Sequence, residues 1–388
     1  MRTVSKTVIG VDFGTQSARA VLVNAENGEI IYSCRKEYPY NSTPVPAIDC
    51  AENLPCATDY EMTLYELLRN VIPEEYRKTV AGICIDATSL TMVLLAEDGR
   101  ALSELDGWSE AAHARVKLWK YHRAQEKADE ALNLASNLQE PFLGRTGGSI
   151  SCEWMLPKLL EVRDEAPEIY SKIDLAMDLC EFLTFRLTGQ LVRSIGSLSY
   201  KCLWAEDLSF PERTFLNGLR AGFYEEYCHF LRGDVRKPGE CAGMLRSELT
   251  KRWGLPEQIP VATGMLDGHT SLATMGAFEP GDAALIVGTS NVCTVQDRKL
   301  QELKDVCGVA QEGMVTGSCG IDTGQSSTGN MLGWFVEHMA GWQIHREAEE
   351  RKISPHQVLA ERIQKPWENK VIAVDWWSGS RNAPCDLT

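Results

Sequence analysis

The stretch that decides the fold is VIGVDFGTQSAR, which covers residues 8–19. It begins as an apolar, β-branched run, passes through a turn that contains Gly14 and Thr15, and enters a second strand-like run. The stretch LIVGTSNV, at residues 285–292, repeats this order of strand, Gly-Thr-Ser turn and strand. Tight turns of this kind present backbone N–H groups and hydroxyls that suit a phosphate. Two such turns from two halves of one chain can hold a nucleoside triphosphate from both sides.

The length of the chain predicts two domains, because 388 residues exceed the size of an ordinary single core. The composition shifts after Pro238 and Gly239, and the run at 259–262 is expected to open a second strand-rich region. We therefore predict an N-terminal lobe over residues 1–255 and a C-terminal lobe over residues 256–388.

The net charge of −15 disfavours two classes of partner, because an acidic surface repels nucleic acid and anionic membranes. The thirteen cysteines are scattered and include no CxxC pair, which indicates reduced thiols in a cytosol. The N-terminal residues do not have the pattern of a signal peptide, and no run reaches 18 apolar residues. We expect a cytoplasmic protein that binds neither nucleic acid nor membranes, and a homodimer is left open.

Hydrophobic spacing predicts the elements around the two turns. The expected strands cover residues 7–12, 18–23, 29–34, 80–86 and 92–96. The expected helices cover residues 60–71, 109–137, 154–163, 180–187 and 270–275.

The first turn offers the groups that phosphoryl transfer requires, which are hydrogen-bond donors, positive charge and a metal ligand. Asp12 follows a buried strand and is placed to hold Mg²⁺, directly or through water. Gly14 lets the backbone approach a phosphate. Thr15 and Ser17 supply hydroxyls, and Arg19 supplies charge. Alone, this stretch is a weak signal and indicates only an ordinary β-turn with a capping Asp; its pairing with residues 288–290 favours phosphate binding.

Asp267 is the candidate catalytic base. It lies in the stretch GMLDGH, residues 264–269, between a strand and a predicted helix. A carboxylate there can accept the proton of a hydroxyl that attacks phosphorus. It can equally be a helix N-cap, because Asp is common at that position. The residues by themselves leave both roles open.

The chain resembles the FGGY carbohydrate kinases of the sugar-kinase, actin and heat-shock-chaperone superfamily, and within them the bacterial ribulokinases. The motifs that carry the resemblance run through nearly the whole chain and are VDFGT (11–15), VKLWK (116–120), GGSIS (147–151), EWM (153–155), YK (200–201), DGH (267–269), GTS (288–290), GQS (324–326) and DWW (375–377).

The resemblance implies an α/β chain with a duplicated actin-like, ribonuclease-H-like ATPase fold, in which two lobes flank a nucleotide cleft. It implies ATP and Mg²⁺ as cofactors and a small sugar as the second substrate. The expected reaction is phosphorylation of a ketopentose, with ribulose first and xylulose or another polyol as the alternative.

The resemblance also assigns site residues. Asp267 matches the catalytic base of the family, and Gly329 matches a position beside the nucleotide, although a small residue there also eases helix packing. The implied nucleotide-binding residues of the second lobe are Gly288, Thr289, Ser290 and Gly329. The implied sugar-binding residues are Ser89, Lys201, Asp267 and Asp322. Ribulokinases usually carry Ala at the first of these positions and Glu at the last, so the preferred ketose is left open.

The sequence ends at Thr388, whereas related kinases continue and complete their second lobe with a Gly-rich loop against adenine. We therefore expect an incomplete second lobe, an uncovered apolar face and weak ATP binding. A sugar-binding fragment with impaired catalysis is the alternative from a different functional class.

Overall fold

The larger sheet is built around β1 and β4, two parallel neighbours that both have an aspartate as their penultimate residue. The protein is seen here as a computed structural model, which describes residues 5–38, 54–288, 290–363, 377 and 379. The strands of this sheet follow the order β3-β2-β1-β4-β10-β9, and β11 also pairs with β4. Their bounds are β1 (Thr7–Phe13), β2 (Ser17–Asn24), β3 (Ile30–Glu37), β4 (Val80–Ala87), β9 (Cys241–Met244), β10 (Pro260–Ala262) and β11 (Met265–Leu266).

Alternation of side chains places the core on one face of this sheet. In β1 the odd-numbered side chains Ile9, Val11 and Phe13 are buried, as expected for a strand with a period of two. Two helices, α1 (Ala57–Asn70) and α5 (Leu179–Thr188), pack against the sheet and contribute to the same core. The expected helices over 60–71 and 180–187 are thereby confirmed, and Gly189 ends the second of them in the left-handed conformation.

The smaller sheet contains the second turn. Its antiparallel strands follow the order β12-β13-β15-β14. The edge strand β12 leaves Leu285 and Val287 more than half exposed, which fits the expectation of an uncovered apolar face. The bounds are β12 (Ala283–Val287), β13 (Asn291–Asp297), β14 (Gly308–Gln311) and β15 (Cys319–Gln325).

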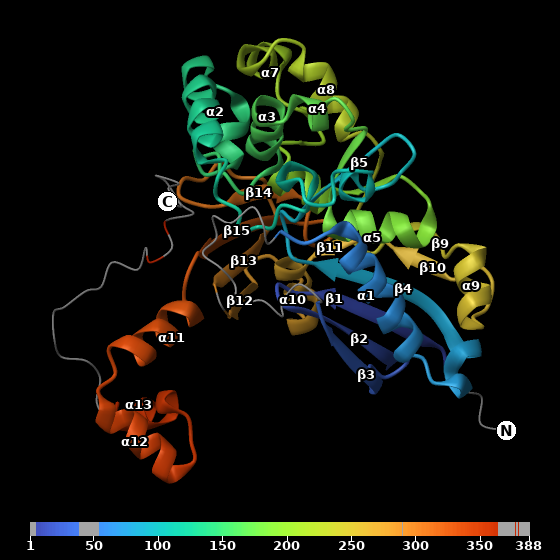
Figure 1. Cartoon of the computed structure of the whole chain (residues 1–388), viewed down its shortest axis with the longest axis vertical. Coiled ribbons are helices and arrows are strands. Elements are labelled where there is room, and N and C mark those ends of the chain that lie inside the picture. The colour runs from blue at the N-terminus through green and yellow to red at the C-terminus, as the bar shows by residue number, and fades with distance from the viewer. Residues whose placement is uncertain (1–4, 39–53, 289, 364–376, 378, 380–388) are drawn as a thin grey trace.

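A mostly helical region lies beyond the end of the larger sheet (Figure 1). It includes two short strand pairs, β5 with β6 and β7 with β8. Its helices are α2 (Gln125–Leu138), α3 (Met155–Glu165), α4 (Pro167–Tyr170), α6 (Ile195–Lys201), α7 (Arg213–Leu219) and α8 (Phe223–Phe230), and its strands are β5 (Met92–Leu95), β6 (Leu175–Asp178), β7 (Val192–Ser194) and β8 (Asp234–Arg236).

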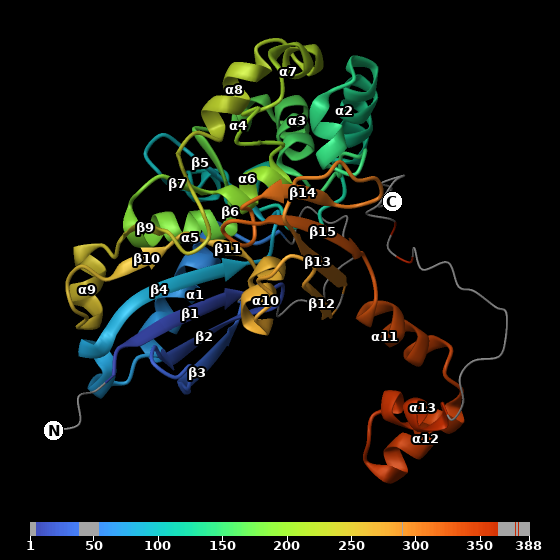
Figure 2. The same cartoon turned by 180° about the vertical axis from the view of Figure 1, so that it is seen from behind.

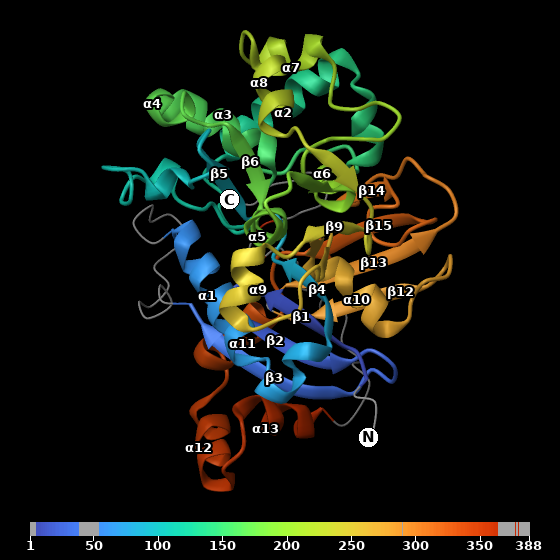
Figure 3. The same ribbon diagram turned by 90° about the vertical axis from the view of Figure 1, so that its right-hand side faces the viewer.

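The remaining helices flank the sheets or extend from them. Helix α9 (Ser247–Trp253) lies at the β9–β10 side of the larger sheet, and α10 (Asp267–Met275) lies between the two sheets (Figures 2 and 3). The chain then leaves the body as an arm (Figure 1). The arm consists of α11 (Gly329–His338), α12 (Trp342–Arg351) and α13 (Pro355–Arg362).

Helix α6 joins the helical region to the smaller sheet through Tyr200. This ring is buried, and its hydroxyl donates to the Gly320 carbonyl at 2.7 Å. It fills space that three glycines leave open, because a Cβ atom at Gly308, Gly313 or Gly320 would lie 2.6–2.8 Å from the tyrosine.

One predicted helix is wrong over half of its length. The stretch 109–137 was expected to be one amphipathic helix, but its regular helix is α2, which begins only at Gln125. The preceding part contains a short 3₁₀ helix at Ala112–Ala114 and an extended segment. Lys117 there exchanges two backbone hydrogen bonds with Met92, at 2.8 and 3.1 Å. Backbone groups that are used in this way cannot form helical hydrogen bonds.

The strand at 259–262 also differs from the expectation. It is β10, which pairs with β4 and β9 in the larger sheet and does not open the smaller one. The smaller sheet begins only at Ala283, with β12. The apolar run itself could not show this, because it identifies a buried strand without identifying its neighbours. The domain boundary near residue 255 stays a prediction.

Two adjacent glycines allow a prediction about how the helical region meets the smaller sheet. Gly147 and Gly148 both have positive φ angles, of 67° and 83°. A Cβ atom at Gly147 would lie 2.0 Å from the Val306 carbonyl oxygen, whereas one at Gly148 meets nothing within 4 Å. We expect Gly148→Ala to cost about 1–2 kcal/mol of stability, the cost of the left-handed conformation alone. Gly147→Ala adds the displacement of the loop at Val306 and costs clearly more. Urea unfolding of the two variants checks this, and equal midpoints would contradict it.

Candidate functional site

The two glycine-containing turns lie on one cleft. In the first turn, the Gly14 N–H donates to the Ser17 carbonyl at 3.1 Å. In the second, the Gly288 N–H donates to the Ser290 carbonyl at 3.0 Å. Both turns contribute to the lining of a cleft of about 730 Å³. The sequence-based expectation that two distant hairpins share one groove is therefore confirmed.

The cleft lies between the larger sheet, the smaller sheet and the helical region. Of the expected site residues, those that line it are Asp12, Thr15, Ser89, Lys201, Asp267, Gly288, Ser290 and Asp322. The volume is within the range typical of sites that enclose small ligands.

Asp12 and Asp86 form a carboxylate pair at the floor of the cleft. They lie opposite each other on the parallel strands β1 and β4, and their side chains share a hydrogen bond. Burial, together with the negative charge of Asp12 and Asp267, raises the pKa of the Asp86 carboxyl to about 8. Asp86 therefore carries a proton at neutral pH and can donate it to Asp12. Arg19 contacts Asp12 from the other side, at 3.3 Å.

Asp267 is the first residue of α10. Its Oδ1 atom accepts the N–H of the next residue, Gly268, at 2.7 Å. Burial raises the pKa of the Asp267 carboxyl to about 6; the Gly268 N–H and Lys201 oppose this shift, and the charge of Asp12 adds to it. A pKa near neutrality lets one carboxyl accept a proton and later release it. The N-cap of α10 is Leu266, and no side chain caps the helix, so the N-cap role that the sequence left open is not observed. Asp267 lines the cleft, as the role of a base requires.

Lys201 and Asp322 form a buried ion pair on the opposite wall. Their Nζ and Oδ2 atoms lie 3.2 Å apart, and His269 Nε2 lies 3.6 Å from the same Oδ2. Burial alone would raise the pKa of the Asp322 carboxyl, but Lys201 and His269 more than offset it, and this pKa lies well below its ordinary value. Asp322 is therefore an ionised acceptor beside a donor ammonium, which suits the hydroxyls of a polyol.

The other expected site residues lie next to the cleft without lining it. The Ser17 hydroxyl is buried on β2 and accepts a hydrogen bond from Arg35 at 3.0 Å. The Gly329 N–H donates to the Gly288 carbonyl at 2.9 Å and so supports the second turn. Arg19 contacts Asp12, which lines the cleft, and Gly14 directly precedes Thr15, which also lines it. Thr289 lies outside the described residues.

Asp86, His269 and Trp119 also line the cleft and were not among the expected site residues. Asp86 could have been predicted from the sequence, because the stretch IDATS at residues 85–89 contains an aspartate followed by a threonine, as the first turn does. His269 directly follows the DG pair of the candidate base. Trp119 lines the cleft, and its Nε1 atom donates to Thr15 Oγ1 at 3.1 Å. No local pattern indicates that contact, because it joins residues 104 positions apart.

Comparison with known proteins gives matches over nearly the whole chain. Residues 7–274 match the family model described as "FGGY family of carbohydrate kinases, N-terminal domain". The ribulokinase of Halalkalibacterium halodurans is 32% identical over 392 residues, which cover 98% of this chain and 70% of that protein. The ribulokinase of Mycolicibacterium smegmatis is 35% identical over 397 residues, covering 98% of this chain and 69% of that protein.

Solved structures show the same fold. A ligand-bound xylulose kinase from Lactobacillus acidophilus superimposes with a TM-score of 0.75 at 18% identity, covering 98% of this chain and 71% of that one. A xylulose kinase from Rhodospirillum rubrum gives a TM-score of 0.73 at 20% identity, with 97% and 71% coverage. These superpositions confirm the expected fold. Together with the family model and the sequence relatives, these findings show that the chain belongs to the FGGY family of carbohydrate kinases.

Proposed function

We propose that this chain catalyses the ATP-dependent phosphorylation of a ketopentose, with ribulose converted to ribulose 5-phosphate. The observation that carries the proposal is the cleft, which joins two phosphate-type turns to a carboxylate of raised pKa and a buried Lys–Asp pair. The ribulokinases that are similar over 98% of the chain support ribulose as the ketose. No disulfide joins the cysteines that the structure describes, which fits a cytoplasmic location.

In the proposed reaction Asp267 removes a proton from the terminal hydroxyl of the sugar. The hydroxyl oxygen then bonds to the γ-phosphorus, the bond to the β,γ-bridging oxygen breaks, and ADP leaves. Lys201, Asp322 and Ser89 orient the sugar. The turns at Thr15 and Gly288 offer N–H groups and a hydroxyl to the phosphates.

The Asp12–Asp86 pair fits a magnesium ion. Two carboxylates at hydrogen-bond distance require a proton or a cation between them, and Mg²⁺ prefers oxygen ligands. Among the residues that the structure describes, no three acidic, histidine or cysteine side chains are grouped to enclose a metal by themselves. That is compatible with Mg²⁺, which is commonly held by one or two carboxylates and by substrate phosphates. Bound there, it would neutralise charge on the transferred phosphoryl group.

A ketose panel tests the proposal. Release of ADP is measured with ribulose, xylulose, glycerol and gluconate at equal concentrations, and the phosphorylated product is identified by mass spectrometry. We expect the highest kcat/KM with ribulose. A clear preference for xylulose would favour the alternative ketose. Sugar binding by calorimetry without any ADP release would favour the sugar-binding fragment.

The raised pKa of Asp267 predicts the pH dependence of the reaction. A base must be deprotonated to act, so kcat/KM should fall about tenfold per pH unit below pH 6 and level off above it. The rate is measured from pH 5 to pH 8 at saturating MgATP. If kcat/KM does not fall as the pH is lowered through about 6, the assignment of Asp267 as the base is contradicted.

A further inference from the structure

The turn after β4 places Ser89 in the cleft but has an unfavourable backbone. Leu90 is buried, at 3% exposure, and has a φ angle of 63°. This left-handed conformation is rare for a leucine, because its Cβ approaches the following carbonyl. Such a conformation persists only where surrounding contacts enforce it. Ser89, directly before it, lines the cleft.

A buried lysine holds the carbonyl side of this turn. Lys158, on α3, is fully buried, and its Nζ atom donates to the Leu90 carbonyl at 2.6 Å. The same ammonium donates to the Leu118 carbonyl at 2.9 Å, with the Lys117 carbonyl at 3.4 Å. The charge is therefore satisfied by backbone carbonyls of two segments that wall the cleft. An ammonium removed from water is costly unless it is fully hydrogen-bonded, so its contacts are strong constraints.

A buried aspartate holds the amide side of the same turn. Asp178, at the end of β6, is fully buried, and its Oδ2 atom accepts the Leu90 N–H at 3.0 Å. That oxygen also accepts the Ser197 hydroxyl at 3.2 Å, while Oδ1 accepts the Leu179 N–H at 2.8 Å. Both backbone polar groups of Leu90 are thus held by buried lysine and aspartate side chains from different elements.

We infer that Lys158 and Asp178 are positioning residues, which together clamp the Ser89–Leu90 turn and thereby place Ser89 against the sugar. The effect on the sugar rests on the proposed function, whereas the effect on the turn does not.

The first test replaces Lys158 with methionine, which keeps an unbranched apolar side chain and removes the terminal donor. Hydrogen exchange of the peptide that covers residues 88–92 should become at least about tenfold faster, because a charge-assisted contact of the turn is lost. A peptide within β1 should keep its protection. The KM for ribulose should rise about tenfold, with the KM for ATP changed less than about twofold.

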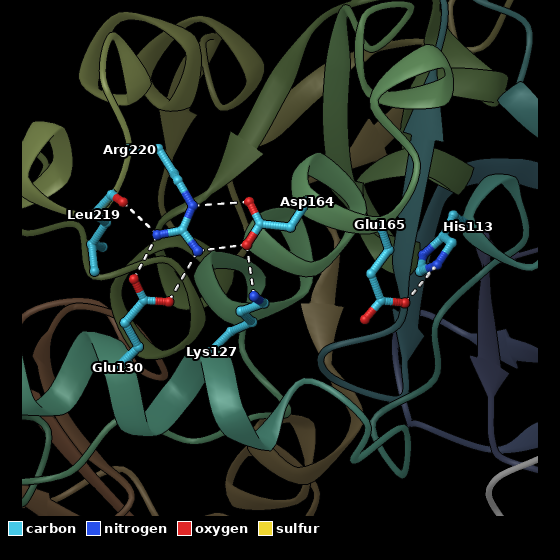
Figure 4. A network of polar contacts seen from close by, with 7 residues as sticks. All are labelled: His113, Lys127, Glu130, Asp164, Glu165, Leu219 and Arg220. Carbon is cyan, nitrogen blue, oxygen red and sulfur yellow. Dashed lines mark hydrogen bonds and ion pairs between the residues drawn. The ribbon is translucent and has the colours of Figure 1, made fainter.

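The chain offers a matched control in the same region. Lys127 Nζ pairs with Asp164 at 2.6 Å in a network that includes Arg220 and Glu130 and lies away from the cleft (Figure 4). Lys127→Met removes a lysine and an ion pair but no cleft contact. It should change neither the exchange of residues 88–92 nor the KM for ribulose.

A second variant keeps the test decisive if Lys158→Met does not fold. Asp178→Asn preserves the shape of the side chain and weakens the acceptor for Leu90, and it should move the same two readouts in the same direction. Unchanged exchange at 88–92, or equal rises in the KM for both substrates, would overturn the clamp. If the unmodified chain turns over no ketose at all, the proposed function fails, while the exchange data still decide whether the turn is clamped.

Discussion

Asparagine in place of Asp267 should lower kcat by about two to four orders of magnitude, the usual contribution of a general base. The amide cannot accept the proton of the attacking hydroxyl, yet it has the shape of the carboxylate and retains an oxygen for the Gly268 N–H. The loss should fall on kcat, since the sugar is also contacted by Lys201 and Asp322 in the proposed complex. Initial rates with ribulose measure it.

The control for this variant is nucleotide binding. Titration calorimetry with MgATP should give the same Kd before and after the change, because the two turns are untouched. Asp106→Asn, which alters an exposed acid outside the cleft, should leave kcat as it is. Near-normal turnover of the Asp267→Asn variant would remove Asp267 from the mechanism.

Lys201→Met should have the second large effect, on stability and on sugar affinity together. The change leaves Asp322 buried and without its ammonium, which typically costs about 3–5 kcal/mol. Since the pKa of Asp322 is depressed in the folded state, the pair stabilises the protein above the unfolded carboxyl pKa of about 4, and this stabilisation fades as the pH falls below that value. The difference in urea midpoint between the unmodified chain and the Lys201→Met variant should therefore be large at pH 7 and smaller at pH 3.

Two comparisons separate this effect from the general loss of a lysine. Lys36 forms an exposed pair with Glu66 at 3.0 Å, and Lys36→Met should cost less than about 1 kcal/mol. The double change Lys201→Met with Asp322→Asn should cost less than the two single changes added, because no charge is left buried alone. Simple additivity would show that the two side chains do not stabilise each other.

The sequence predicted the parts of the site that local patterns encode. Each turn follows an apolar strand and contains its glycine, so Gly14 and Gly288 were recognisable along the chain. The meeting of the two turns followed from the resemblance of the whole chain, and local spacing alone would not have given it. Asp267 was identified in the same way, because a cap and a base have the same local pattern.

The rest depended on contacts between distant residues. Asp86 joins Asp12 only through the pairing of β4 with β1, and Leu90 is held by side chains from α3 and β6. The segment before α2 looked helical, but a backbone pairing with Met92 replaced the helical hydrogen bonds. Tertiary hydrogen bonds of this kind override local propensity and leave no periodic pattern.

The seating of Tyr200 among three glycines has a mechanical consequence. The Tyr200 ring is hydrogen-bonded to Gly320, and the next residue, Lys201, is paired with Asp322. Helix α6 and the smaller sheet therefore move as one rigid unit. A hinge motion between the lobes would then leave the Lys201–Asp322 wall intact and open the groove mainly where the two hairpins face each other. The end of the cleft that contains the Lys201–Asp322 pair would be preformed before a ligand binds. The end between the two hairpins would be the flexible one.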